Sequence, residues 1–225
     1  MKKIVFIMMA MLMAVIPSTA QNYKHSKYYN QKTGHLDYGF NNKGVDTYYG
    51  IRIGPGFSYV TSDDSRLDGG DWQTGLNVGV VAGFPLTYSD PLYLETGLYY
   101  IEKGGKKSLG GGKKMTYDLN YLEIPVVVKY KYEIDDDLTI EPFAGGYFAA
   151  GVGGKIKNFA EREAQSSFRS DNFRRLDGGL RIGCGIGYDI FYADLTYDHA
   201  LANNTHDTLD KARNRAVMLN FGVNF

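Results

Sequence analysis

A glycine- and lysine-rich stretch, Gly104–Met115, has the composition of a phosphate-binding loop. It departs from the phosphate-loop pattern because Gly112 and Lys113 are followed by Lys114, where the pattern requires Ser or Thr, and no helix is predicted after it. We therefore interpret this stretch as a flexible, basic external loop whose lysines could contact lipid phosphates.

An acidic cluster and four histidines are the other candidates for chemistry. The carboxylates of Asp63, Asp64, Asp68 and Asp71 offer the oxygen ligands that calcium prefers, but their spacing matches no defined calcium loop. The histidines are His25, His35, His199 and His206. We therefore predict no metal site and no cofactor.

His199 follows Asp198 near the end of a strand-like segment, which raises the question of an outer-leaflet lipid-modifying enzyme. Such an enzyme would need an acyl-transfer nucleophile near His199 on the same face, and the sequence places none there. In a regular strand Asp198 and His199 also point to opposite faces. We therefore predict no catalytic residue.

A third set of polar residues lies inside strand-like segments. In the stretch YLEIPVVVKY, Tyr121–Tyr130, every second residue from Leu122 is apolar, whereas Glu123 and Lys129 share the other face. A face so rich in charge and glycine cannot fill a dry core, and tyrosines cluster near strand ends, as in the interfacial belt of a membrane barrel. The apolar faces are therefore expected to meet lipid, with these charges inward: Arg52, Glu95, Glu123, Lys129, Glu141, Asp177, Arg181, Asp194 and Asp198.

The elements that position these charges are predicted to be eight antiparallel strands of an up-and-down transmembrane β-barrel, an all-β fold. The predicted strands are Thr47–Val60, Gly75–Pro85, Leu92–Lys103, Met115–Tyr132, Leu138–Gly153, Arg175–Tyr188, Phe191–Ala200 and Ala216–Phe225. Long and short connections alternate between them, which is typical of outer-membrane barrels with short periplasmic turns and longer extracellular loops. The long connections are Thr61–Thr74, Gly104–Lys114, Gly154–Arg174 and Leu201–Arg215.

Three prolines oppose this interpretation, because proline removes a ladder hydrogen bond and a closed barrel has no free edge. We expect a bulge or a local gap at Pro125, and the same question arises at Pro55 and Pro142.

The remaining sequence places the barrel in an exported chain. Residues 1–20 have the Lys2-Lys3 start, the apolar run and the Ser18-Thr19-Ala20 end of a cleaved signal peptide. Residues 21–46 are polar and are interpreted as a flexible periplasmic arm, and residues 47–225 as the barrel. The 25 basic and 25 acidic residues balance, which argues against nucleic acid as a partner. The single cysteine excludes an internal disulfide.

The predicted lumen has six acids and three bases among its nine charges. An eight-stranded barrel is just wide enough for side chains to fill, so we expect an ion-paired polar plug that fixes the barrel shape. A narrow, cation-selective conduit is the alternative.

Several segments together resemble the PorT-like outer-membrane β-barrel family. They are GIRIGPGFSYV, ETGLYY, YLEIPVVVKY, EPFAGGYFAAG and LDGGLRIGCGIGYDI, with the signal peptide end Ala20-Gln21. The resemblance implies a Bacteroidetes-type Gram-negative source and a barrel in the cell outer membrane. The resemblance implies that some members of the family serve protein secretion across the outer membrane. It implies no catalytic or ligand-binding residues. Phe225, which ends an alternating strand, looks like the signal for the barrel assembly machinery.

The expected function is therefore a non-enzymatic membrane anchor or scaffold, acting through its extracellular loops and periplasmic arm. Expected partners are outer-membrane lipid and lipopolysaccharide, the barrel assembly machinery during biogenesis, and envelope or secretion-complex proteins. A narrow porin-like channel for ions or small solutes is the second hypothesis, and a lipid-modifying enzyme is the third.

Overall fold

The computed structural model describes residues 47–62, 69–87, 90–108, 114–135, 137–157, 165–167, 175–201 and 212–225. The predicted signal peptide and arm, residues 1–46, lie outside these ranges. The described part of the chain contains no helix that is long and apolar enough to cross a membrane.

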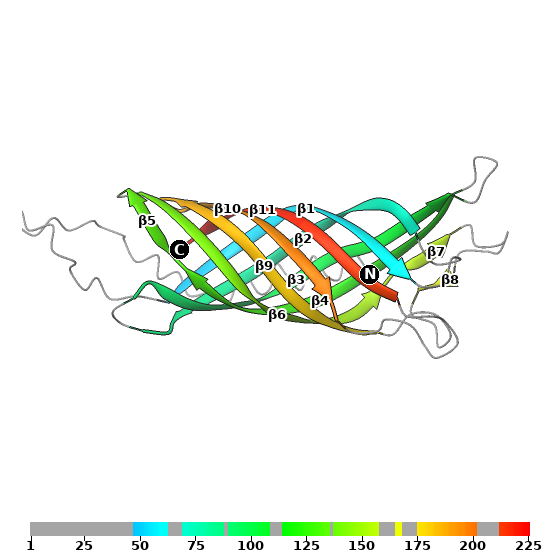
Figure 1. The fold of residues 1–225 in the computed structure, drawn as a ribbon, viewed down its shortest axis with the longest axis horizontal. Coiled ribbons are helices and arrows are strands. Elements are labelled where there is room, and N and C mark those ends of the chain that lie inside the picture. Colours follow the sequence, from blue (N-terminus) through cyan, green and yellow to red (C-terminus); the bar gives the residue numbers. More distant parts are fainter. Residues whose placement is uncertain are drawn as a thin grey trace, which may run out of the picture. The chain divides into compact units, whose positions relative to one another are not determined.

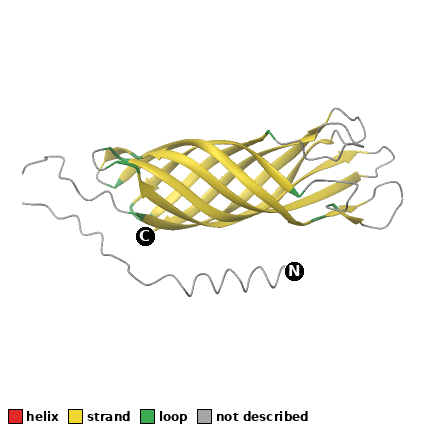
Figure 2. Cartoon of the chain, turned by 90° about the horizontal axis from the view of Figure 1, so that it is seen from below, coloured by secondary structure: helices red, strands yellow, loops and turns green. Residues whose placement is uncertain are grey.

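The described residues form a closed antiparallel barrel within the compact unit Asn42–Asn224 (Figures 1 and 2). Each long strand pairs with its neighbours along the chain, and the first and last strands pair to close the sheet. This confirms the predicted eight-stranded up-and-down barrel. Its long strands in the described ranges are β1 Tyr48–Ser62, β2 Gly69–Pro85, β3 Leu92–Ser108, β4 Lys114–Tyr130, β6 Leu138–Gly153, β9 Leu176–Tyr188, β10 Phe191–Ala200 and β11 Ala212–Asn224.

The barrel has two different ends. The chain turns tightly at one of them, called here the short-turn end, where Asp189 takes a positive φ of 52° between β9 and β10. Aspartate tolerates this left-handed conformation because its short side chain can bond locally. At the opposite end, on the right of Figure 1, β1 and β3 end and β2 and β4 begin; we call it the long-loop end, after the long connections predicted there.

At the long-loop end, the strands continue further than predicted. β2 begins at Gly69 rather than Gly75, and β3 ends at Ser108 rather than Lys103. Part of the stretch interpreted as a basic loop is therefore strand. A ladder of main-chain hydrogen bonds needs no apolar alternation, so these polar extensions carried no periodic signal.

Three short strands complete the sheet. β5, Tyr132–Asp135, pairs with β6 at the short-turn end. β7, Lys155–Lys157, pairs with β4, and β8, Gln165–Ser166, pairs with β7. The last two lie within the predicted loop Gly154–Arg174, which is therefore partly ordered sheet.

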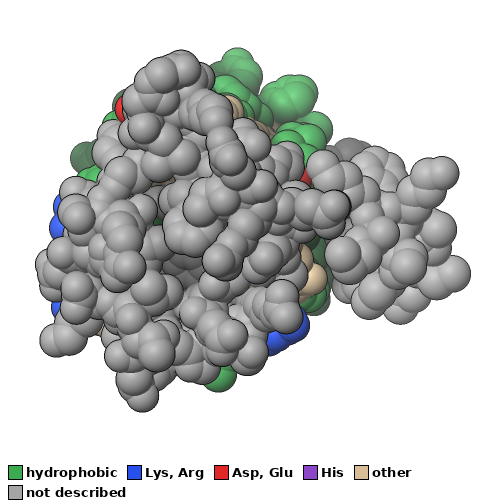
Figure 3. Space-filling model, turned by 90° about the vertical axis from the view of Figure 1, so that its right-hand side faces the viewer, with side chains coloured by type: hydrophobic (Ala, Val, Ile, Leu, Met, Phe, Trp, Pro, Cys, Tyr) green, Lys and Arg blue, Asp and Glu red, His purple; other side chains and the backbone are tan. Residues whose placement is uncertain are grey.

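The predicted alternation of faces is confirmed. In β4, residues from Leu122 to Tyr130 alternate between exposed and buried, with the apolar row outside. In β11, Leu219 and Phe221 are exposed, whereas Met218 and Asn220 are buried. Seen from the long-loop end, apolar side chains project at the margin of the barrel unit (Figure 3).

The prolines are accommodated by gaps in pairing rather than by bulges. The β3–β4 ladder pairs Thr96 with Val126 and Tyr99 with Glu123 in one register, but skips the positions around Pro125. The β1–β11 ladder likewise skips Pro55 without a change of register. Pro142 lies just beyond Phe143, the last residue of β6 that pairs with β4.

Many of the tyrosines lie inside the barrel rather than in the outer belt that the sequence suggested. Tyr48, Tyr99 and Tyr192 are buried, and each ring lies over an inward-facing glycine. A Cβ added to Gly79 would come within 2.5 Å of the Tyr99 ring. The glycines of the inner face therefore make room for tyrosine rings, and only part of the tyrosines remains for the lipid interface.

Candidate functional site

All nine charges predicted to face the lumen are buried. The most exposed of them is Glu95, at 8 %. They come from six different strands, because alternation turns one residue in two of each strand inward. They separate into a central cluster, a cluster toward the short-turn end, and groups held mainly by neutral partners.

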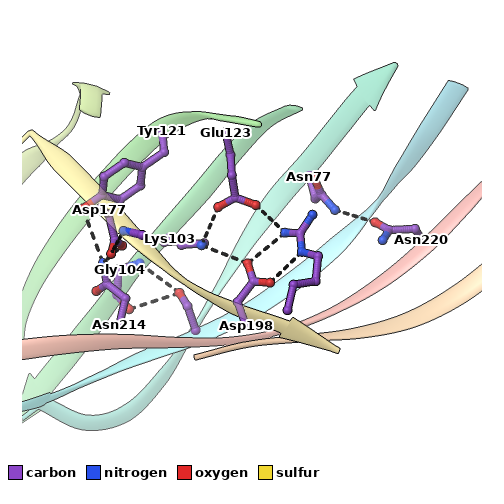
Figure 4. A network of polar contacts seen from close by, with 12 residues as sticks. Asn77, Lys103, Gly104, Tyr121, Glu123, Asp177, Asp198, Asn214 and Asn220 are labelled. Atoms are coloured by element: carbon purple, nitrogen blue, oxygen red, sulfur yellow. Dashed lines mark hydrogen bonds and ion pairs between the residues drawn. The ribbon is translucent and has the colours of Figure 1, made fainter. Parts of the chain in front are cut away.

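The central cluster joins two cations to two carboxylates. Lys103 Nζ lies 2.7 Å from Glu123 Oε2 and 3.0 Å from Asp198 Oδ2. Arg181 donates from Nε to Asp198 Oδ1 at 2.7 Å, and from Nη2 to both Asp198 Oδ2 and Glu123 Oε1. Each cation contacts both acids, so the four charges form a neutral ring, which we call the central quartet (Figure 4).

Sequence reasoning missed Lys103, a member of this quartet. The third strand was predicted to end there, and the residue was not included among the inward-facing charges. Alternation could have found it, because Lys103 has the same parity as Glu95, Tyr99 and Ile101, all of which face inward. The missing signal was the true length of β3, which continues to Ser108.

The cluster toward the short-turn end is built around Lys129. Its ammonium group lies 2.7 Å from Glu95 Oε2 and 3.4 Å from Glu141 Oε2, and donates to Tyr192 Oη at 2.9 Å. Tyr48 donates its hydroxyl hydrogen to Glu95 Oε2. These contacts again neutralise a buried lysine with nearby acids.

Arg52 and Asp194 rely mainly on neutral partners. Arg52 donates to the carbonyl of Val223 and to Asn224 Oδ1, and its guanidinium carbon lies 3.9 Å from the centre of the Tyr192 ring. Asp194 accepts hydrogen bonds of 2.7 Å from Thr196 and from Asn220. Hydrogen bonding thus compensates the burial of charges that lie outside the two clusters.

Asp177 lies toward the long-loop end and is also held by neutral donors. Its carboxylate accepts from Asn214 Nδ2 at 3.0 Å and from the backbone amide of Gly178 at 2.7 Å. Asn214 also donates to Tyr121 Oη at 3.4 Å. The sequence analysis predicted only charged residues for the lumen, so it did not identify the neutral partners Asn214 and Tyr121.

Several of these contacts join opposite walls of the barrel. In the strand order, β10 is four strands from β3, so the contact between Lys103 and Asp198 spans the lumen. β11 is four strands from β4, so the contact between Asn214 and Tyr121 does the same at another level. The network therefore braces the barrel across its width, as Figure 4 shows.

The other candidate residues are not gathered into this network. His199 lies outside the barrel wall, with Nδ1 3.3 Å from Tyr197 Oη, whereas Asp198 points inward to the quartet. Phe225 is 43 % exposed after β11. Asp63, Asp64, Asp68, His25, His35 and His206 lie outside the described residues, and among those described no group of His, Cys, Asp and Glu could hold a metal ion.

Comparison with known proteins gives one family and several structural likenesses. A comparison with curated proteins finds no match. Among solved structures, the chain is similar to Ail, the attachment invasion locus protein of Yersinia pestis, with 17% identity, a TM-score of 0.40, and coverage of 80% of this chain and 99% of that one. It is also similar to Neisserial surface protein A, with 12% identity, a TM-score of 0.49, and coverage of 80% and 99%. A third is OprG from Pseudomonas aeruginosa, with 12% identity, a TM-score of 0.43, and coverage of 82% and 98%.

The family model described as "Outer membrane protein beta-barrel domain" matches residues 21–206. This span covers most of the chain and most of the described barrel strands. The chain therefore belongs to the outer membrane protein beta-barrel domain family.

Proposed function

We propose that this outer-membrane barrel is a PorT-like, non-enzymatic anchor. Its barrel holds the extracellular loops and the N-terminal arm in place, and these contact envelope or protein-secretion partners. The observation that supports an anchor is the central quartet, which joins opposite walls of the lumen. Lys103 and Arg181 are each shared by Glu123 and Asp198, so these four buried charges already neutralise one another within the barrel.

A conduit for ions would need these charges to exchange partners with the passing ion. Breaking one buried pair leaves an uncompensated charge, which costs about 3–5 kcal/mol. An eight-stranded barrel offers little room for an alternative path. A braced lumen therefore favours a rigid support over a channel, and loops held on a rigid scaffold are the usual carriers of binding.

Cross-linking in living cells tests the partner-binding part of this proposal. The tagged full-length protein would be compared with variants that lack residues 21–46 or residues 154–174, and the captured proteins identified by mass spectrometry. We expect one defined set of envelope or secretion proteins that is lost in at least one deletion variant. Both variants must first show the heat-dependent gel mobility of a folded barrel. Capture of abundant membrane neighbours alone, from all three proteins, would contradict the proposal.

Conductance in a planar bilayer tests the alternative of a narrow channel. We expect no steady single-channel conductance from the wild-type protein. A steady, cation-selective conductance would overturn the anchor proposal in favour of the channel. The same recording on Arg181→Met provides a comparison, because that variant removes one of the two cations of the central quartet.

A further inference from the structure

A row of cationic and aromatic side chains lies on the outer surface at the long-loop end. His199 of β10 pairs across the ladder with Arg215 of β11, which pairs in turn with Tyr59 of β1. The residues next to them in each strand, Asp198, Ala216 and Ser58, are buried in the lumen, so the row faces away from it. With their neighbours these residues form what we call the arginine–aromatic row: Tyr59, Trp72, Tyr197, His199, Arg213 and Arg215.

Contacts within the row hold its side chains in place. Arg215 donates from Nη1 to Tyr59 Oη at 3.2 Å, and its guanidinium carbon lies 5.8 Å from the centre of the Tyr59 ring. The Tyr59 and Trp72 rings pack with centres 4.5 Å apart. Tyr197 Oη lies 3.3 Å from His199 Nδ1. The row is thus a pre-formed surface on neighbouring strands.

The charge of the row is not balanced on its own face. The outward-facing described residues of β1, β10 and β11 include Arg213, Arg215 and His199 but no carboxylate. In β2, Asp71 next to Trp72 is exposed, and it lies opposite Lys106 in the β2–β3 ladder. The nearby acid Asp198 is turned inward and engaged by Lys103 and Arg181. Arg215 is only half-buried, and within the described structure its hydrogen bond is the one from Nη1 to the neutral hydroxyl of Tyr59. A guanidinium binds most strongly to a charged acceptor, so this face is complementary to an anion with several acceptor oxygens.

The depth of the row matches that of a lipid headgroup. Between the row and the middle of the barrel wall the outer surface is apolar, because Phe57, Leu195 and Leu219 are all exposed there. Within the row, Arg213 is exposed and lies next to Ala212, where β11 begins. Tyr and Trp concentrate where hydrocarbon gives way to headgroups. In outer-membrane barrels the longer connections face outside, so the row lies level with the outer leaflet.

We propose that the arginine–aromatic row binds a phosphate group of the phosphorylated glycolipid in the outer leaflet. The planar guanidinium of Arg215 supplies paired donors that match phosphate oxygens, and Arg213 adds a second positive charge. Tyr59 orients Arg215, and Trp72, which packs against Tyr59, lies beside the lipid. This binding does not depend on whether the loops or the arm contact protein partners.

Native mass spectrometry of the purified full-length protein, released from detergent micelles, tests the proposal. The probes are bis-phosphorylated lipid A, the same lipid with its phosphates removed, and phosphatidylglycerol. We expect wild-type protein to retain bis-phosphorylated lipid A in preference to both other lipids. The double variant Arg213→Gln/Arg215→Gln should retain about tenfold less of it, as expected for the loss of a charge-assisted contact. Lys155→Gln, which removes an exposed cation of β7 outside the row, should retain it as the wild type does.

Two results would overturn this site. Equal retention by the wild type and the double variant would show that the row does not hold the lipid. Equal retention of the dephosphorylated lipid or of phosphatidylglycerol by the wild type would remove the assignment to a glycolipid phosphate. The lipid comparison uses wild-type protein alone, so it stays decisive even if the double variant fails to fold. It is also independent of the cross-linking outcome for protein partners.

Discussion

Arg181 and Arg215 occupy the two faces of the same barrel wall and have opposite surroundings. Arg181, in β9, points into the lumen and contacts the carboxylates of Asp198 and Glu123. Arg215, in β11, points outward and contacts the hydroxyl of Tyr59. The difference teaches that the barrel supplies the partners of its internal charges itself, whereas its outer cations are left for a ligand from the membrane.

The largest expected effect comes from removing the internal arginine. Arg181→Met leaves Glu123 and Asp198 to share Lys103, and an uncompensated buried carboxylate costs about 3–5 kcal/mol. Urea unfolding of the barrel in phospholipid vesicles, followed by the fluorescence of the single tryptophan Trp72, measures this loss. Adding Asp198→Asn to the variant leaves a simple pair of Lys103 and Glu123 and should recover part of the stability. A loss below about 1 kcal/mol for Arg181→Met would show that water already screens the quartet.

A change of volume in the lumen should have the next largest effect. Gly79→Val places side-chain atoms against the Tyr99 ring, because even a Cβ would lie 2.5 Å from it. Overpacking of this kind costs about 1–3 kcal/mol, measured by the same urea titration. Gly153→Val is the matched control, since a Cβ there meets no atom within 4 Å. Equal stability of the two valine variants would mean that the ring moves aside freely.

A smaller effect is expected at a buried acid outside the ion-paired clusters. Asp194 accepts hydrogen bonds from Thr196 and Asn220, and an asparagine oxygen can accept the same bonds. Asp194→Asn should therefore cost about 1 kcal/mol or less. Asp198→Asn, at the centre of the quartet, should cost clearly more in the same experiment. If the two variants lose the same stability, the pairing of charges is not what distinguishes these sites.

The smallest effect on stability is expected outside the barrel. Arg215→Gln removes a surface contact with Tyr59, and such changes usually alter the free energy of unfolding by less than about 0.5 kcal/mol. The midpoint of urea unfolding in lipid A-free vesicles should match that of the wild type. A loss comparable with that of Arg181→Met would instead assign Arg215 a structural role in the wall.

The fold could be predicted from the sequence because a membrane barrel imposes a strict period of two. The rows that include Leu122, Leu219 and Ile182 faced lipid as expected, and the opposite rows faced the lumen. The inward position of all nine predicted charges followed from the same alternation. Strand ends were less accurate, since the polar extensions of β2, β3 and β11 lie where alternation carries no information.

At Pro125, the sequence predicts that the strand pairing is interrupted, and the tertiary structure shows the form of the interruption. The sequence alone indicated that Pro125 must interrupt a ladder, because it has no amide hydrogen to donate. Only the structure decided that the interruption is a gap in the β3–β4 pairing with an unchanged register, beside a hydrogen bond of 2.7 Å from Thr96 Oγ1 to the Pro125 carbonyl.

The sequence by itself determined the barrel, the face that each strand turns to lipid, and the burial of its charges, because these depend on the order of residues along single strands. The partners of those charges were decided only by the tertiary structure. Lys103 meets Asp198, and Asn214 meets Tyr121, across a lumen whose strand tilt and register bring residues from opposite walls to the same height. The same register sets His199, Arg215 and Tyr59 in one row on the outside. These contacts between distant strands form only when the whole sheet closes, and the pattern of a single strand does not determine how it closes.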